Sequence, residues 1–213
     1  MFDYLLFDLD GTLTDSKEGL FKSFRYALSH YGIEENDEAN LKRFIGPPAH
    51  YAFCEFYNFS EDKAIEAVSI FRERFESIGI FENMLYDGVF DMLKALKEHG
   101  KKLALATAKP EHSAWVVLEH FNIAQFFDVV SAATRENRDH NKTKILQKAI
   151  AELNAPKDKV VMIGDRKFDI LAAKELDIKT IGVQYGYAPP NELYECGCDY
   201  IVDSVSELLN ILL

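Results

Sequence analysis

A short apolar run that ends in two acidic residues constrains the fold of this chain more than any other feature. Tyr4–Phe7 is apolar and has the length of a buried strand in a parallel sheet. Asp8 and Asp10 follow this run, and Gly11 can provide the sharp turn at which the chain leaves the strand. Open α/β sheets bind their ligands at the carboxyl ends of their strands. Two carboxylates placed there repel each other unless a cation lies between them, so the pattern favours a hard cation such as Mg²⁺.

The second part of the chain alternates regularly between helical and strand patterns. Helices are expected at residues 89–99, 110–121, 143–153 and 169–175. Strands are expected at residues 103–106, 126–130, 160–163, 180–183 and 200–202. The segment Ser204–Glu207 has the pattern of a capping box and predicts a final helix. Strands separated by helices predict an α/β fold, a Rossmann-like parallel sheet with helices on both faces.

Residues 16–81 differ from the rest because they carry helical patterns and no strand pattern. The break at Gly46-Pro47-Pro48 and the expected helix cap at Ser60 divide this stretch into several helices. We therefore expect an all-helical domain of residues 16–81, inserted into an α/β core domain of residues 1–15 and 82–213. The alternative is one domain with the extra helices packed onto it.

The segment from Asp8 to Thr12 resembles the first motif of the haloacid dehalogenase (HAD) superfamily. Phosphatases of that superfamily carry Asp-x-Asp-x-Thr after the first strand, and this chain reads Asp8-Leu9-Asp10-Gly11-Thr12. The resemblance implies that Asp8 is the nucleophile that attacks phosphorus and that Asp10 is the general acid and base. It also implies that the helical insertion is the cap domain of this superfamily.

Two further segments resemble the second and third motifs. A hydroxyl at Thr107, with the backbone amides of Ala108 and Lys109, can hold phosphate oxygens, although a helix-capping role for Thr107 is the alternative. Lys142 stands where the third motif has its lysine, which would offset the charge of the nucleophile and the phosphoryl group. The segment departs from the usual Lys-Pro-x-Pro form, so Lys144 remains an alternative to Lys142.

The string Gly164-Asp165-Arg166-Lys167-Phe168-Asp169 resembles the fourth motif. By this resemblance Asp165 would complete a Mg²⁺ shell with the carboxylate of Asp8 and the backbone carbonyl of Asp10. Asp169 would support that shell, either directly or through water. The alternative role for an acid in the first turn of a helix is to interact with the helix dipole.

Within the superfamily the chain looks like the phosphoglycolate-phosphatase-like branch, which also contains 5′-nucleotidases and pyrophosphatases. This resemblance rests on the position of the helical insertion, on the fourth motif and on Tyr185-Gly186-Tyr187. It implies a Mg²⁺-dependent hydrolysis of a small phosphomonoester through an aspartyl-phosphate intermediate. Arg43 in the insertion is a candidate contact for the leaving group, and an ordinary surface role is the alternative.

Two other functions share parts of the pattern. Sugar phosphomutases resemble the N-terminal segment, but they carry a histidine in the first cap helix where this chain has Leu20. Receiver-like phospho-signalling domains also combine an acidic Mg²⁺ pocket with a Thr and a Lys. They are shorter, however, and their phosphoacceptor Asp follows the third strand. Both of these alternative functions, a mutase and a receiver-like domain, are therefore less favoured than a phosphatase.

The charge of the chain excludes other classes of partner. The sequence has 24 Lys and Arg against 35 Asp and Glu, which gives a formal net charge of −11. An average surface of this sign repels nucleic acid polymers and anionic membranes. No apolar stretch reaches the roughly 18 residues of a membrane helix, and the N-terminus lacks a signal-peptide pattern. We expect a cytoplasmic monomer or homodimer whose partner is a small phosphorylated metabolite.

Overall fold

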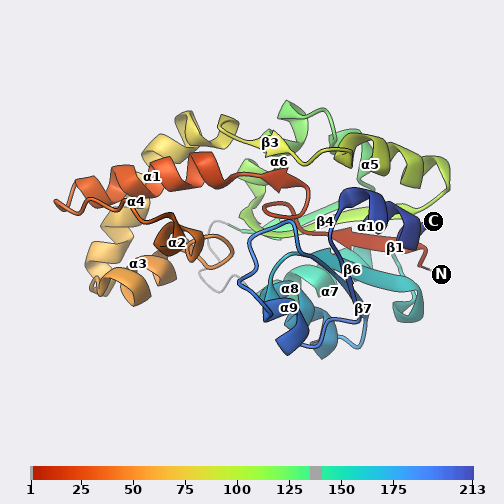
Figure 1. Ribbon diagram of the computed structural model, residues 1–213. Coiled ribbons are helices and arrows are strands. Elements are labelled where there is room, and N and C mark those ends of the chain that lie inside the picture. The colour runs from red at the N-terminus through yellow and green to blue at the C-terminus, as the bar shows by residue number, and fades with distance from the viewer. Residues whose placement is uncertain (1, 135–140) are drawn as a thin grey trace. The chain divides into compact units, whose positions relative to one another are not determined.

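The computed structural model describes residues 2–134 and 141–213, and the chain divides into two compact units. Ser16–Met84 forms the helical unit. The segment that ends at Asp15 forms the α/β unit together with Leu85–Leu213. Figure 1 shows the sheet in one unit and the helices α1 to α4 in the other.

The α/β unit contains a parallel sheet of six strands in the order β5-β4-β1-β6-β7-β8. Its strands are β1 (Tyr4–Phe7), β4 (Lys102–Pro110), β5 (Val129–Ala133), β6 (Val160–Gly164), β7 (Lys179–Val183) and β8 (Tyr200–Val202). This is the strand order of the Rossmann fold, so the predicted fold class is confirmed. The order reverses beside β1, and ligands of such sheets bind at this reversal. A separate two-stranded sheet joins β2 (Thr14–Asp15) to β3 (Met84–Leu85).

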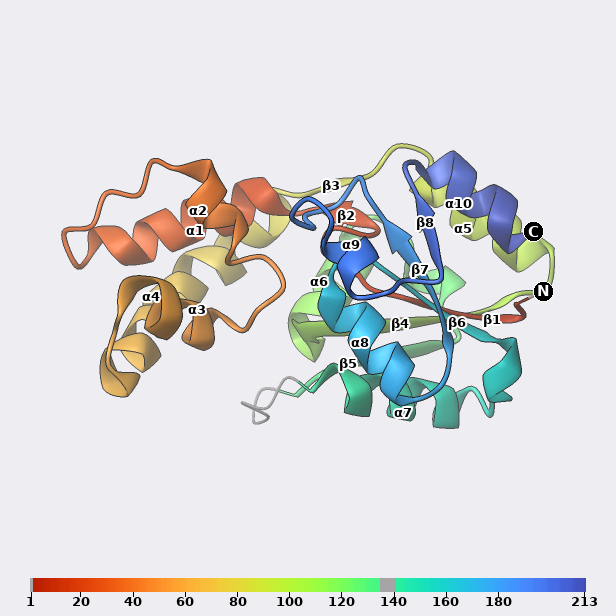
Figure 2. The same cartoon turned by 60° about the horizontal axis from the view of Figure 1, so that its bottom comes forward.

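Helices cover both faces of the six-stranded sheet. They are α5 (Val89–Glu98), α6 (Glu111–His120), α7 (Lys142–Glu152), α8 (Lys167–Glu175), α9 (Glu192–Glu195) and α10 (Val205–Leu212). Figure 2 shows α5 and α10 together on one side, and α7 and α8 together on the other. Short 3₁₀ turns lie at η2 (Ala124–Phe126) and η3 (Lys157–Lys159). Among the residues that the structure describes, no helix has both the length and the apolar composition of a membrane span.

The side chains of β1 alternate between the two faces of the sheet. Leu6 is fully buried in a core cluster with Leu146 and Ala149 of α7 and with Ala173 of α8. Leu5 and Phe7, which are also fully buried, therefore point to the opposite face. Asp8, which follows Phe7, lies on the same side of the strand as Leu6. Its side chain is therefore directed toward α7 and α8.

Besides the short strands β2 and β3, which the sequence did not predict, two predicted strands have clearly different bounds in the structure. The structure has β5 at Val129–Ala133 instead of residues 126–130, because Ala124–Phe126 forms a 3₁₀ turn. The small residues at the end of β5 carry little strand signal, and the hydroxyl of Ser131 is satisfied by donating to the carbonyl of Ile145 at 2.8 Å. Strand β4 continues to Pro110 instead of ending near Ala106, and its register shifts between Thr107 and Pro110.

The helical unit is built around aromatic rings. Its helices are α1 (Lys17–Ser29), α2 (Glu38–Lys42), α3 (Ala49–Tyr57) and α4 (Glu61–Ser77), and η1 (Gly79–Phe81) follows them. The ring of Phe24 in α1 lies 4.2 Å from Phe44, 5.6 Å from Phe53 and 4.4 Å from Phe71. Buried aromatic contacts of this kind join helices that have no sheet to pack against. Ser60 caps α4, as predicted, by accepting a hydrogen bond from the backbone of Lys63 at 3.4 Å.

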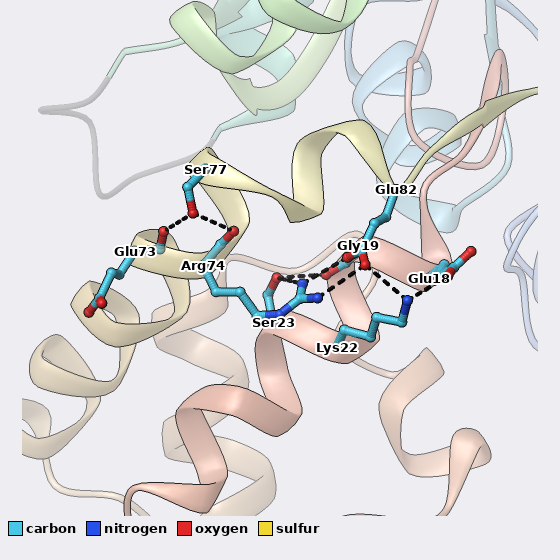
Figure 3. A network of polar contacts seen from close by, with 8 residues as sticks. All are labelled: Glu18, Gly19, Lys22, Ser23, Glu73, Arg74, Ser77 and Glu82. Carbon is cyan, nitrogen blue, oxygen red and sulfur yellow. Dashed lines mark hydrogen bonds and ion pairs between the residues drawn. The ribbon is translucent and has the colours of Figure 1, made fainter.

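A network of polar contacts ties Glu82 to the first and last helices of the unit (Figure 3). Arg74 of α4 donates to the two carboxylate oxygens of Glu82 at 2.8 and 3.1 Å, and also to the hydroxyl of Ser23 at 3.1 Å. Lys22 of α1 donates to Glu82 at 2.9 Å. The backbone of Gly19 donates to the carbonyl of Glu82 at 3.1 Å. The segment that leaves the helical unit is therefore fixed to α1 and α4 by both its backbone and its side chain.

We expect Glu82→Gln to destabilise the helical unit in a pH-dependent way. Hydrogen bonding from Arg74, with a further contribution from Lys22, lowers the pKa of Glu82 from its ordinary value of 4.5 to about 2. The ionic contribution of Glu82 is therefore complete above about pH 4.5 and is lost as the pH falls toward about 2. At pH 7 the variant should lose about 1–2 kcal/mol of unfolding free energy in urea, followed by circular dichroism.

The difference between Glu82→Gln and the parent chain should shrink when the measurement is repeated near pH 3.5. Glu98→Gln serves as the control, because Glu98 is exposed and its ion pair with Lys94 spans 4.0 Å. A loss of the same size at both pH values would contradict this account of the network.

Candidate active site

The carboxyl ends of β1, β4 and β6 meet at the point where the strand order reverses. Phe7 at the end of β1 lies beside Leu105 of β4 and Ile163 of β6. The ladder continues one residue further, since the backbone of Asp8 donates to the carbonyl of Ile163 at 2.9 Å. Asp165 follows β6 directly. The register of the sheet thus brings together two acids that lie far apart in the sequence.

Three carboxylates form a cluster at this edge of the sheet. One oxygen each from Asp8, Asp165 and Asp169 lies within 4.8 Å of the others. Asp8 reaches the cluster because its parity directs it toward α7 and α8, and Asp169 lies in the first turn of α8. The second oxygen of Asp169 accepts from the backbone of Arg166 at 3.2 Å, which fixes the carboxylate at the start of the helix.

The ammonium group of Lys142 joins two members of the cluster. It lies 2.9 Å from Asp8 Oδ1 and 2.7 Å from Asp169 Oδ1, and the Lys142 side chain is only 8% exposed. Helix α7 begins at Lys142 because the side chain of Asn141 caps it by accepting from the backbone of Lys144 at 3.2 Å. Lys144 itself is exposed. Of the two lysines left open by the sequence, the structure therefore brings Lys142 to the acids.

The cluster carries more negative charge than its surroundings compensate. Burial raises the pKa of Asp165 well above its usual range, and the charges of Asp169 and Asp8 add to this effect. Burial also raises the pKa of Asp169 to about 6, despite the opposing effect of Lys142. Burial alone would lower the pKa of Lys142, but the charges of Asp169 and Asp8 outweigh it and raise that pKa. A further cation beside these buried acids would favour their ionised form.

The donor set fits a hard divalent cation. Asp165 Oδ1 is buried and has no hydrogen-bond partner within the described part of the chain. Its Oδ2 accepts from the backbone of Tyr187 at 2.8 Å. Counted as ionised, the acids of the site carry four negative charges, and its two lysines carry two positive charges. Two negative charges therefore remain. The residues counted are Asp8, Asp10, Asp165, Asp169, Lys109 and Lys142. An all-oxygen site with this excess charge suits Mg²⁺.

Asp10 forms a separate ion pair. Lys109 Nζ lies 3.1 Å from Asp10 Oδ1 and 2.9 Å from Asp10 Oδ2, and the Lys109 side chain is only 4% exposed. The backbone amide of Lys109 donates to the hydroxyl of Thr107 at 3.2 Å. Sequence reasoning singled out Thr107, Ala108 and Lys109 as phosphate-binding groups and missed the pair with Asp10. Lys109 lies in the part of β4 where the register shifts, between Thr107 and Pro110, and the sequence has no clear signal for this shift.

Glycines allow the acids to pack against the backbone. A Cβ atom on Gly11, whose φ is +86°, would lie 2.2 Å from Asp165 Oδ2. A Cβ atom on Gly164 would lie 2.3 Å from the carboxyl carbon of Asp169. No larger residue fits at either position without moving a carboxylate.

Arg43, the candidate contact in the insertion, lies within the helical unit. It follows α2, and its guanidinium carbon lies 4.0 Å from the centre of the Phe56 ring. A cation–π contact of this kind orients the guanidinium group.

This sheet order, with an acid after the first strand and a lysine–carboxylate cluster beside it, defines a class of α/β enzymes that act on phosphate groups. Residues 5–183 match the model of the haloacid dehalogenase-like hydrolase family. The match covers most of the chain, and the chain belongs to this family. The resemblance noted in the sequence is thereby confirmed.

Several similar proteins carry the names of phosphate-hydrolysing enzymes. A 5′-nucleotidase of Pseudomonas aeruginosa is 38% identical over 89% of this chain and 86% of that protein. Pyrophosphatase PpaX of Anoxybacillus flavithermus is 31% identical over 98% of this chain and 95% of that protein. A crystal structure described as a predicted phosphatase from Clostridium acetobutylicum has a TM-score of 0.94 and 40% identity, and covers 100% of this chain and 98% of that one. The chain is a phosphatase of this family.

We expect Lys142→Met to destabilise the metal-free protein, because the substitution leaves buried carboxylates without their shared cation. Removing one partner of a buried ion pair costs about 3–5 kcal/mol. Urea unfolding of the metal-free variant should show a loss of this size. Lys144→Met is the matched control, since Lys144 is exposed two residues away, and it should change the free energy by less than about 0.5 kcal/mol. Equal effects of the two substitutions would contradict the role given to Lys142.

Proposed function

We propose that this chain is a Mg²⁺-dependent phosphatase that hydrolyses a small phosphomonoester through a covalent intermediate on Asp8. The contact between Lys142 and the carboxylates of Asp8 and Asp169, beside Asp165, carries the proposal. A nucleophile near a phosphoryl group needs its negative charge offset, and Lys142 supplies one positive charge for this purpose. Asp8, Asp165, Asp169 and the carbonyl of Asp10 would hold the metal. When bound, Mg²⁺ would supply further positive charge to the phosphoryl oxygens.

The first step forms one bond and breaks another. A carboxylate oxygen of Asp8 attacks phosphorus, and the bond between phosphorus and the ester oxygen breaks. Asp10 takes up a proton when the phosphoryl group enters and Lys109 turns from Asp10 to the phosphoryl oxygens, and as general acid it gives this proton to the leaving oxygen. In the second step Asp10 takes a proton from a water molecule that attacks the same phosphorus. The bond to Asp8 then breaks, inorganic phosphate leaves, Asp8 is again a carboxylate, and Asp10 carries the proton taken from water.

Lys109 and Thr107 prepare the site for the phosphoryl group. The ion pair between Lys109 and Asp10 holds the acid in place before the substrate binds. A phosphoryl group that enters the site would bring its own negative charge, which Lys109 can share with Asp10. The hydroxyl of Thr107 and the amide of Ala108 would complete the contacts to the phosphoryl oxygens. Each of these roles assigns a polar group of β4 to the substrate.

The substrate is best sought among small phosphorylated metabolites. The sequence motifs favour a phosphoglycolate-phosphatase-like reaction. The 38% identical relative named 5′-nucleotidase supports a nucleoside monophosphate, and the 31% identical pyrophosphatase supports pyrophosphate. The helical unit would act as the cap, and Arg43 is its candidate contact to the leaving group. All three substrates would use the same phosphoryl chemistry and differ only in the group released.

Asp8→Asn should abolish turnover while the protein stays folded. The amide has nearly the same shape as the carboxylate but is not a nucleophile, so the turnover number should fall by more than about 10³-fold. Release of inorganic phosphate measures the loss, and circular dichroism checks the fold. Asp91→Asn on the exposed side of α5 is the matched control and should keep full activity. Activity within tenfold of the parent in Asp8→Asn would refute the nucleophile.

A panel of substrates should show a strict need for Mg²⁺. Activity should vanish with a chelator and return with Mg²⁺, while Ca²⁺ should restore little because it prefers a larger and looser shell.

The panel contains phosphoglycolate, nucleoside 5′-monophosphates, pyrophosphate, a hexose 1-phosphate and a phosphorylated protein. A small substrate should be cleaved much faster than the phosphoprotein. Full activity without metal would contradict the metal site, and formation of a sugar isomer faster than phosphate release would indicate a mutase.

A further inference from the structure

Tyr187 contacts both the acid cluster and the end of the first segment of the α/β unit. Its backbone amide donates to Asp165 Oδ2 at 2.8 Å. Its hydroxyl donates to Asp15 Oδ1 at 2.8 Å. Asp15 is the last residue of the α/β unit before the chain enters the helical unit at Ser16. Tyr187, a buried residue that follows β7, is thus hydrogen-bonded to two acids, Asp165 and Asp15, that lie far apart in the sequence.

The segment around Tyr187 is packed without free space against the acid cluster. A Cβ atom on Gly186 would lie 2.4 Å from Asp165 Cβ and 2.4 Å from the carbonyl oxygen of Gly11. A Cβ atom on Gly11 would lie 2.7 Å from the Tyr187 ring. The ring and the backbone of this segment therefore rest directly on the turn that follows β1.

Asp15 is connected to Asp10 through a closed turn. The backbone of Gly11 donates to the carbonyl of Thr14 at 2.8 Å, and the backbone of Thr14 donates to the carbonyl of Leu9 at 3.0 Å. These bonds hold residues 9–14 as one turn, and Asp15 follows it immediately. A hydrogen bond that fixes Asp15 therefore also fixes one end of the turn that carries Asp10.

Two neighbouring tyrosines strengthen the same arrangement. The hydroxyl of Tyr185 donates to the carbonyl of Thr12 at 3.0 Å, and its ring lies 4.8 Å from that of Tyr86 in an edge-to-face contact. Tyr86 donates through its backbone to the carbonyl of Leu13 at 3.1 Å. Burial raises the pKa of Tyr185 and Tyr187, so both phenols keep the protons that they donate.

We propose that Tyr187 is a positioning residue for this reaction, because its hydroxyl fixes Asp15 and thereby the turn that holds Asp10. Its kinetic consequence rests on the proposed function, in which Asp10 is the general acid and base. The hydroxyl contacts Asp15 after the turn, whereas the contact to Asp165 in the metal site is made by the backbone amide. Loss of the hydroxyl should consequently slow the reaction without weakening the binding of metal.

Tyr187→Phe separates these two contacts, because it removes the hydroxyl and keeps both the ring and the backbone amide. The turnover number should fall about tenfold or more, as expected for a misplaced catalytic group. The Mg²⁺ concentration that gives half of the maximal activity should change less than twofold. Tyr194→Phe makes the same chemical change at an exposed tyrosine and should leave both values unchanged.

Hydrogen–deuterium exchange of the metal-free protein tests the proposal without relying on activity. Amides of residues 9–15 should exchange at least fivefold faster in Tyr187→Phe than in the parent, while Tyr194→Phe should match the parent. Unchanged exchange in this segment would overturn the proposal. A turnover number within twofold of the parent, or a rise in the Mg²⁺ requirement that accounts for the lost activity, would also overturn it. If the parent chain itself hydrolyses no phosphate ester, the proposed function fails, and the exchange data still decide the role of Tyr187.

Discussion

The ammonium group of Lys142 between Asp8 and Asp169 is the contact on which the candidate site depends. Several buried carboxylates at one edge of a sheet are unfavourable unless a cation compensates them, and Lys142 is only 8% exposed beside them. The contact requires β1 to lie beside β6, and it requires α7 to begin at Lys142. The core cluster around Leu6 meets the first requirement, because it packs β1 against α7 and α8. Packing of the apolar core and compensation of charge thus specify the same arrangement.

Most of the fold could be predicted because its signals are local. Short apolar runs that end in acids marked β1 and β6, and helical spacing marked the segments between strands. The start of α7 had a local signal too, since Asn141 is a good helix cap, and this signal agrees with the preference for Lys142 over Lys144 that the motif indicated. The ion pair of Lys109 with Asp10 had no such signal, because it joins residues 99 positions apart across a register shift. The bond of Tyr187 to Asp15 spans 172 positions and was equally invisible.

The density of packing at the acid cluster explains why the motifs contain glycine. A Cβ atom on Gly11, Gly164 or Gly186 would lie 2.2–2.4 Å from an atom of Asp165 or Asp169. The carboxylates therefore rest against backbone on several sides, and their positions are set by the strands and not by flexible side chains. Preorganisation of this kind is what phosphoryl transfer requires, because the chemistry depends on placing charge before the substrate arrives. It also means that a small shift of the turn after β1 should slow the reaction.

Each unit is fixed internally almost to the residues where the chain passes from one to the other. In the helical unit, Arg74 and the backbone of Gly19 hold Glu82 (Figure 3). In the α/β unit, Tyr187 holds Asp15, and Tyr86 is bonded to the carbonyl of Leu13. The anchor at Asp15 is distinctive, because the same tyrosine also bonds to Asp165, so the chain leaves the α/β unit from a point fixed to the acid cluster.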